Sequence, residues 1–168
     1  MPFSGDQTYG AAVDDVFALF TDPAVIRARY EAAGDRDIEI LECGPQGGPG
    51  GEVFVIRTSR TVDVDIPSFA RKVLKPTNTM VQTDTWSARD LDGARDADFD
   101  IEVKGAPVHV SGQARIEPTD DGGTRHTVNG KLDVKVPLIG GKVAKWAEGP
   151  SQQRLDNEYT FHHERLGS

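Results

Sequence analysis

The chain has 168 residues, of which 37% are hydrophobic and 27% charged, a composition typical of one globular domain with a core of its own. We therefore expect a single domain over residues 1–168. The formal net charge of −8 and the isoelectric point of about 4.9 argue against nucleic acid as a partner and weaken binding to anionic membranes. Cys43 is the only cysteine, which excludes an internal disulfide and a Cys-x-x-Cys motif.

Neither an export signal nor a membrane span is visible in the sequence. Residues 1–17 contain no basic region followed by an apolar run, and no stretch approaches the roughly 18 apolar residues of a transmembrane helix. Together with the lone cysteine, these features predict a cytoplasmic protein without stable membrane insertion. We expect a monomer or a weak homodimer.

The first expected elements are a short strand and two helices. Residues 3–9 are mixed in polarity and predict the strand. The apolar residues that follow have the spacing of one helix face, and they are Val13, Val16, Phe17 and Phe20. Asp22 is a candidate N-cap for a second helix with Pro23 in its first turn, and Gly34 is a candidate C-cap.

From residue 35 onward apolar residues alternate with polar ones, which is the period of a strand with one buried face. Residues 44–51 are rich in glycine and proline and predict a loop. The expected strands are 38–43, 52–65, 79–88, 98–104, 108–117 and 125–136. The short connections at 105–107 and 120–123 fit hairpins, so we expect an antiparallel sheet.

The last segment, residues 138–166, predicts a long helix with two apolar stripes. In its second half the stripe consists of Leu155, Tyr159, His162 and Leu166. In its first half it consists of Ile139, Val143 and Trp146. On a straight helix the two stripes would lie more than about 100° apart, and Gly149-Pro150 stands between them. Because proline removes a backbone donor and clashes with the preceding turn, we predict a bend or break there.

The order of elements is one strand, two short helices, about six antiparallel strands and a long helix. This order, with the run VKVPLIGGKV from Val134 to Val143, resembles the START-like, helix-grip superfamily, which includes polyketide cyclases, birch-pollen-allergen-like proteins and lipid-transfer domains. Within it, the sequence most resembles an actinobacterial family of unknown function. The resemblance implies an α+β fold, a curved antiparallel sheet of about seven strands with the C-terminal helix across its concave face. It also implies an elongated, mostly apolar cavity between sheet and helix.

Eight residues on the apolar phase of the later strands and the C-terminal helix are candidates for the wall of such a cavity. They are Phe99, Ile101, Val110, Ala114, His126, Val128, Leu155 and Tyr159. A ligand site of this kind would have a volume of roughly 300 Å³ or more. The same residues could instead form an ordinary filled core. His126 could be a desolvated proton donor, base or ligand anchor, or it could face solvent beside the turn at 120–123.

No catalytic motif is visible. The sequence contains no Gly-x-Ser-x-Gly, His-Glu-x-x-His, Walker or Gly-x-Gly-x-x-Gly pattern, and the acidic residues of strand 98–104 fall on its polar face. We therefore assign no catalytic residue and expect no cofactor. His162 and His163 are adjacent in a predicted helix, so their side chains would diverge by about 100° and would not share a metal ion. We expect no metal site.

Three hypotheses about function remain. The first, which the sequence favours, is binding or carriage of an apolar small molecule, such as a lipid, a sterol-like or a polyketide-like compound. The second is an enzyme acting on such a ligand, a cyclase, aromatase or hydratase, with His126 and Tyr159 as its acid/base pair. The third is an interaction module with a filled core. The volume of the cavity and the ionisable groups that converge in it distinguish these hypotheses.

Overall fold

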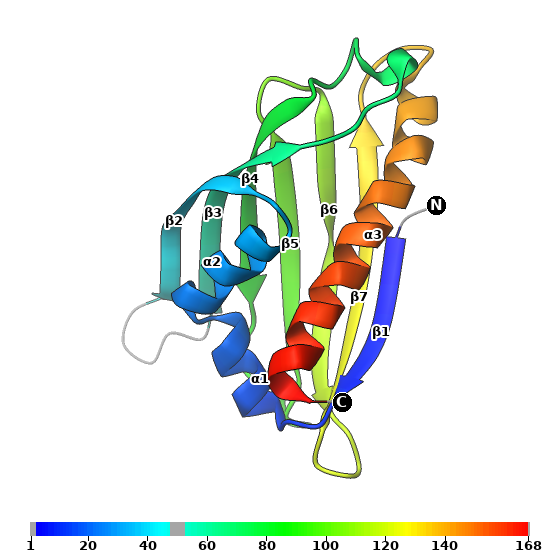
Figure 1. Cartoon of the computed structure of the whole chain (residues 1–168). Coiled ribbons are helices and arrows are strands. Elements are labelled where there is room, and N and C mark those ends of the chain that lie inside the picture. Colours follow the sequence, from blue (N-terminus) through cyan, green and yellow to red (C-terminus); the bar gives the residue numbers. More distant parts are fainter. Residues whose placement is uncertain (1–2, 48–52, 168) are drawn as a thin grey trace.

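The computed structural model describes residues 3–47 and 53–167, and at its centre is a seven-stranded antiparallel sheet (Figure 1). The strands lie in the order β1-β7-β6-β5-β4-β3-β2, so every neighbouring pair except β1 with β7 is consecutive in sequence. Their bounds are β1 Phe3–Tyr9, β2 Arg36–Gln46, β3 Val53–Asp63, β4 Thr77–Trp86, β5 Arg95–Val103, β6 Val108–Pro118 and β7 Thr124–Val134. The prediction of an antiparallel sheet of about seven strands is confirmed.

Helices cover one face of the curved sheet (Figure 1). The short helices α1 (Val13–Phe20) and α2 (Pro23–Ala32) follow β1, and the long helix α3 (Gly140–Leu166) follows β7. Helix α3 packs mainly against β1 and β7, whereas α2 packs against β2 at the opposite edge. The short helices and α3 therefore stand over two different parts of the same face, and the helix-grip arrangement expected from the sequence is confirmed.

Local sequence signals position the second helix. Asp22 caps α2, since its carboxylate accepts a hydrogen bond from the backbone N–H of Ala24 at 2.9 Å. Pro23 occupies the first turn, where a missing N–H removes no intrahelical bond. Gly34 adopts a φ of +87°, the left-handed conformation that commonly follows the last helical turn. Both ends of α2 therefore agree with the prediction.

The segment after Cys43 contains more strand than expected. Residues 44–46 belong to β2 and pair with residues 53–55 of β3, so the prediction of a loop is wrong for these three positions. The strand tolerates Pro45 because β2 is at the edge of the sheet, where one side of the backbone needs no partner. The part of the predicted loop from residue 48 to 51 lies outside the described residues.

Helix α3 continues without interruption through Gly149 and Pro150, so the predicted break is wrong (Figure 1). Both residues are exposed and lie on the solvent side of the helix. The carbonyl group that loses its intrahelical partner at a proline can be hydrated there, which lowers the cost of keeping the helix continuous.

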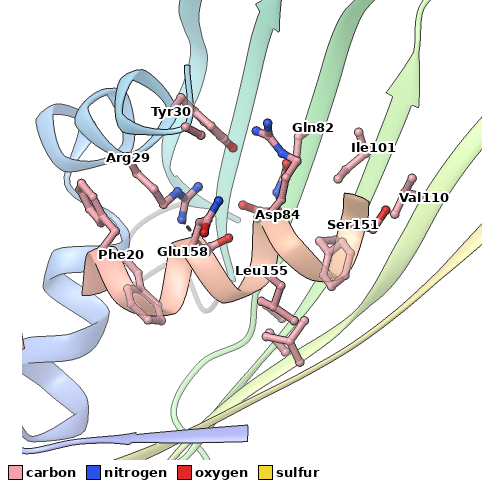
Figure 2. Close-up of a pocket in the computed structure, with 18 of the residues that line it drawn as sticks. Phe20, Arg29, Tyr30, Gln82, Asp84, Ile101, Val110, Ser151, Leu155 and Glu158 are labelled. Atoms are coloured by element: carbon pink, nitrogen blue, oxygen red, sulfur yellow. Dashed lines mark hydrogen bonds and ion pairs between the residues drawn. The ribbon is translucent and has the colours of Figure 1, made fainter. Parts of the chain in front are cut away.

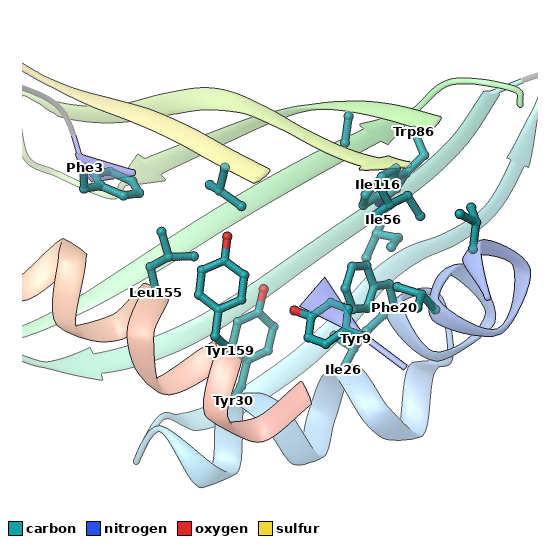
Figure 3. Packing of buried hydrophobic residues seen from close by; sticks show 14 of the residues in the cluster. Phe3, Tyr9, Phe20, Ile26, Tyr30, Ile56, Trp86, Ile116, Leu155 and Tyr159 are labelled. Atoms are coloured by element: carbon teal, nitrogen blue, oxygen red, sulfur yellow. The ribbon is translucent and has the colours of Figure 1, made fainter. Parts of the chain in front are cut away.

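Two apolar clusters explain the two stripes of α3. The larger cluster lies between the sheet, α1, α2 and the second half of α3, and it contains Leu155 and Tyr159 (Figure 3). The smaller cluster contains Val143 from the first half of α3 and residues of the β3–β4 connection, which includes a 3-10 turn at Ser68–Ala70. The apolar side chains in each half of α3 therefore point toward the cluster against which that half packs. The change of phase therefore reflects two packing partners along one helix.

Candidate functional site

A cavity of about 270 Å³ lies on the covered face of the sheet, bordered by α2 and α3 (Figure 2). Its wall takes side chains from β1, from α1 and α2, from β3 to β7 and from α3. The volume is close to the roughly 300 Å³ at which small-molecule sites usually begin. It is also far larger than the voids that close packing leaves in a protein core. The core beneath the helices is therefore not filled.

Most of the residues predicted for a cavity wall are brought together here. The cavity-lining residues among them are Phe99, Ile101, Val110, Ala114, His126, Val128 and Leu155. Tyr159, which was also expected in the wall, is not one of the lining residues. Its ring packs against Gly5 of β1, where a Cβ atom would collide with it, and its hydroxyl donates to the backbone carbonyl of His126 at 3.3 Å. Tyr159 therefore joins α3 to β1 and β7.

His126 is buried, with 3% of its surface exposed, so the alternative of a solvent-facing histidine is wrong. Its Nδ1 atom lies 2.9 Å from the hydroxyl of Tyr9. Burial lowers the pKa of His126 to about 3, and the charge of Glu158 offsets only part of this effect. Because the hydroxyl of Tyr159 is bonded to a backbone carbonyl and not to this ring, the hypothesised acid/base pair is not assembled.

One part of the cavity wall is polar. Arg29 of α2 and Glu158 of α3 form an ion pair at 3.1 Å, and Figure 2 shows Asp84 of β4 beside them. The amide of Gln82 donates a hydrogen bond to Asp84 at 2.9 Å. Burial raises the pKa of Asp84 above its usual value, although the bond from Gln82 and the charge of Arg29 act in the opposite direction. Cationic, anionic and amide groups therefore converge at this part of the wall.

Arg60 of β3 is a further charged residue in the cavity wall, and only 3% of its surface is exposed. Its guanidinium lies over the ring of Tyr30 at 4.2 Å, and its Nε atom lies 3.2 Å from Oδ2 of Asp35. Asp35 also accepts two hydrogen bonds from Arg154 of α3, at 2.6 and 3.1 Å. Among the described residues, neither Nε nor Nη1 of Arg60 has a partner in hydrogen-bond geometry. The wall thus contains buried donors that an oxygen atom of a ligand could satisfy.

The charged residues of the cavity wall were not predicted from the sequence, although the position of Arg60 could have indicated them. The other buried residues of β3 lie on the same phase and are apolar or small, and they are Ile56, Thr58 and Val62. A charged residue on the buried phase of a strand needs compensating partners, which makes it a marker of a polar site inside a core. Arg29 and Glu158 gave no such signal, because their helices carry charged residues on several sides.

Three further features concern a metal site, a membrane-spanning helix and the single thiol. Within residues 3–47 and 53–167, no group of three or more His, Cys, Asp and Glu side chains could hold a metal ion. In the same ranges, no helix is both long and apolar enough to cross a bilayer. The thiol of Cys43 donates to the carbonyl of Thr21 at 3.3 Å, and burial raises its pKa, which disfavours the reactive thiolate.

Residues 4–166 match the protein family described as "Protein of unknown function (DUF2505)". The chain belongs to this family. An uncharacterized protein of Mycobacterium tuberculosis is 25% identical over 166 residues, which make up 96% of this chain and 95% of the relative. An uncharacterized protein of Mycobacterium bovis matches with the same values. The resemblance to an actinobacterial family of unknown function is thereby confirmed.

Solved structures share the fold of this DUF2505 chain. The crystal structure of TTHA0849 from Thermus thermophilus matches with a TM-score of 0.66 and 14% identity, over 99% of this chain and 97% of that chain. The lipid transfer and protein localization domain of human StarD13 matches with a TM-score of 0.58 and 15% identity, over 94% and 75% of the two chains. At such identities the likeness confirms the helix-grip fold alone, so function has to be argued from the cavity.

Proposed function

We propose that this protein binds a small molecule that has an apolar body and one polar end. The observation that carries the proposal is the two-part wall of the cavity, mainly apolar along β5, β6, β7 and one side of α3, and polar where α2, β3 and β4 approach α3. Mainly apolar pockets with a few placed polar groups are typical of small-molecule sites. The shared fold of a human domain named for lipid transfer supports a ligand of the same class.

The apolar part of the wall would hold the body of the ligand. Phe99, Ile101 and Leu155 each contribute a large apolar side chain to it. Transfer of an apolar chain from water to such a surface is favourable by about 25 cal/mol for each Å² buried. A ligand that fills the cavity would also restore contacts that the lining residues lack, since unfilled apolar volume costs stability.

The polar part of the wall would recognise an oxygen-bearing end, and a carboxylate fits it best. The buried nitrogens of Arg60 can donate to it, and hydrogen bonds between charged partners are stronger than those between neutral ones. Three anions lie nearby, and each has a partner that reduces its repulsion of a carboxylate. Asp35 is paired with Arg154, Glu158 is paired with Arg29, and Asp84 accepts a hydrogen bond from Gln82. A fatty acid has both required parts.

Filling the apolar part of the cavity tests the proposal. Leu155→Trp should weaken binding of a fluorescent fatty acid at least tenfold, because the indole would occupy volume that the ligand needs. Circular dichroism should show an unchanged fold. Leu91→Trp, at an exposed position outside the cavity, is the matched control and should bind like the wild type. If the wild type binds no apolar probe, and a solvent extract of the purified protein contains no small molecule by mass spectrometry, the proposal fails.

The polar end is tested with two ligands that differ only in their head groups. The wild type should bind lauric acid about tenfold or more tightly than dodecanol, since a hydrogen bond to a charged group contributes roughly 1.5–3 kcal/mol. Arg60→Leu should lose this difference and keep its affinity for dodecanol. Arg57→Leu, three residues earlier on the exposed phase of β3, is the control and should keep the difference. Equal discrimination by both variants would contradict a role of Arg60 in head-group recognition.

A further inference from the structure

All seven lysines of the chain gather at one end of the molecule, although the net charge is −8. The connections 64–76, 104–107 and 135–139 meet at this end, which is at the top of Figure 1 and contains the smaller apolar cluster. The lysines lie in or beside these connections and in the first turns of α3, and they are Lys72, Lys75, Lys104, Lys131, Lys135, Lys142 and Lys145. Arg71 stands with them. We call these eight exposed residues the lysine end.

Acidic residues compensate this charge only weakly. Within the described part of the chain these lysines form three ion pairs, Lys104–Glu102 at 3.6 Å, Lys135–Asp133 at 3.9 Å and Lys145–Glu148 at 3.8 Å, and every side chain in them except Glu148 is at least half exposed. Asp65 is a further acidic residue in the same connections. Pairs this long with at least one exposed side chain contribute little and are readily exchanged for other partners. The lysine end therefore presents a local excess of positive charge on an otherwise acidic molecule.

A fully exposed leucine stands within the lysine end. Leu138 has 103% relative exposure and a φ of +72°, a conformation that costs energy for a residue other than glycine. The turn around it is fixed, because the N–H of Ile139 donates to the carbonyl of Pro137 at 2.9 Å and that of Gly140 to Val136 at 3.0 Å. The backbone therefore holds an apolar side chain in solvent, in the middle of the basic residues.

We propose that the lysine end docks the protein on a membrane surface containing anionic lipids, with Leu138 entering the headgroup layer. Charges act over a Debye length of about 8 Å at physiological ionic strength, so the nearby lysines outweigh the more distant acidic residues. Long lysine stems can lie along apolar surface while their ammonium groups contact phosphates. Docking in this way differs from stable insertion, and it does not depend on which ligand the cavity binds.

Nucleic acid is the other polyanion that a basic surface could meet, and two observations disfavour it. The lysine end has seven lysines and one arginine, whereas arginine is the residue suited to phosphate and base recognition in nucleic acids. A leucine with its whole side chain in solvent gains nothing from a phosphate backbone, but it gains from contact with acyl chains.

Flotation with lipid vesicles tests the proposal. The wild type should float with vesicles of equal parts phosphatidylcholine and phosphatidylglycerol, should not float with phosphatidylcholine alone, and should be released as salt is raised. Leu138→Ser should reduce the bound fraction several-fold, and the triple variant Lys72→Gln, Lys75→Gln, Lys135→Gln should abolish binding. The matched control is Arg89→Gln with Leu91→Ser in the β4–β5 connection, at the opposite end of the sheet, where Leu91 is 106% exposed. It should bind like the wild type.

Three results would overturn the proposal. The first is no flotation with phosphatidylglycerol vesicles at low salt. The second is an equal loss of binding in the control variant at the opposite end of the sheet. The third is salt-sensitive binding to duplex DNA that is tighter than binding to vesicles and unaffected by Leu138→Ser, which would assign the lysine end to nucleic acid.

Discussion

Two imidazole rings lie inside the core, and they differ in their partners, since Nδ1 of His126 lies 2.9 Å from the hydroxyl of Tyr9. His162 of α3 is 1% exposed, and within the described residues neither of its ring nitrogens has a hydrogen-bond partner. Its ring centroid lies 4.4 Å from that of Phe20. Burial, with smaller effects of Arg29 and Arg165, lowers the pKa of His162 to about 2. A buried histidine without partners costs stability at any pH, and it adds an acid-sensitive group to the core.

The pH dependence of stability follows from this shift. The folded-state pKa values of His126 and His162, about 3 and 2, lie below the ordinary value of 6.5, so the unfolded chain binds more protons in between. Stability should therefore be complete above pH 6.5 and fall as the pH decreases below it, by up to about 1.4 kcal/mol per pH unit for each histidine. His162→Leu should raise the unfolding midpoint at pH 7 and flatten its decline toward pH 4. His109→Gln, at a more exposed position, is the control, and a destabilised His162→Leu would contradict this account.

At the scale of elements, periodicity correctly predicted the strands that have one buried face. It failed for helix α3, whose two halves pack against different apolar clusters. The strands alternate because each has one wet face, so β5, β6 and β7 could be assigned from residues such as Phe99 and Val128. The residues of the 64–76 connection have no regular period, and their contribution to a second apolar cluster could not be predicted. The phase change in α3 was therefore attributed to Pro150, when its cause is that second cluster.

Pro150 lies inside a continuous helix, where proline is unfavourable, so replacing it should raise the stability of the folded protein. Pro150→Ala restores an N–H donor to the carbonyl of residue 146, and alanine is favoured over proline in helix interiors by roughly 3 kcal/mol. Loss of proline also raises the conformational entropy of the unfolded chain, which lowers stability by about 0.4–1 kcal/mol, so we expect a net stabilisation of roughly 2 kcal/mol in denaturant titration. The control is Pro107→Ala in the β5–β6 turn. It removes a proline outside any helix, so it should only lower stability slightly, through the greater entropy of the unfolded chain. An unchanged or lowered midpoint for Pro150→Ala would mean that the proline fits this helix without strain.

At the scale of the whole molecule, charged residues join elements that the apolar core leaves apart. Asp35, after α2, contacts Arg60 of β3 and Arg154 of α3, and its side chain is 2% exposed. The ion pair of Arg29 with Glu158 joins α2 to α3 in the same region. Because the cavity removes apolar contacts between these elements, the polar residues hold its two sides in place. The same residues also determine what the cavity can bind.

The Asp35 network should therefore contribute far more to stability than ion pairs at the surface. Asp35→Asn leaves Arg60 buried without its counter-charge, and breaking a buried pair in this way typically costs about 3–5 kcal/mol. The comparison is Arg36→Gln, which removes a pair with Asp63 whose two side chains are about half exposed, and which should cost far less because solvent screens the pair. Denaturant titration measures both values. Added salt should reduce the effect of Arg36→Gln and hardly change that of Asp35→Asn, since buried charges are screened little. Equal costs for the two variants would show that α2, β3 and α3 are held together by the apolar core alone.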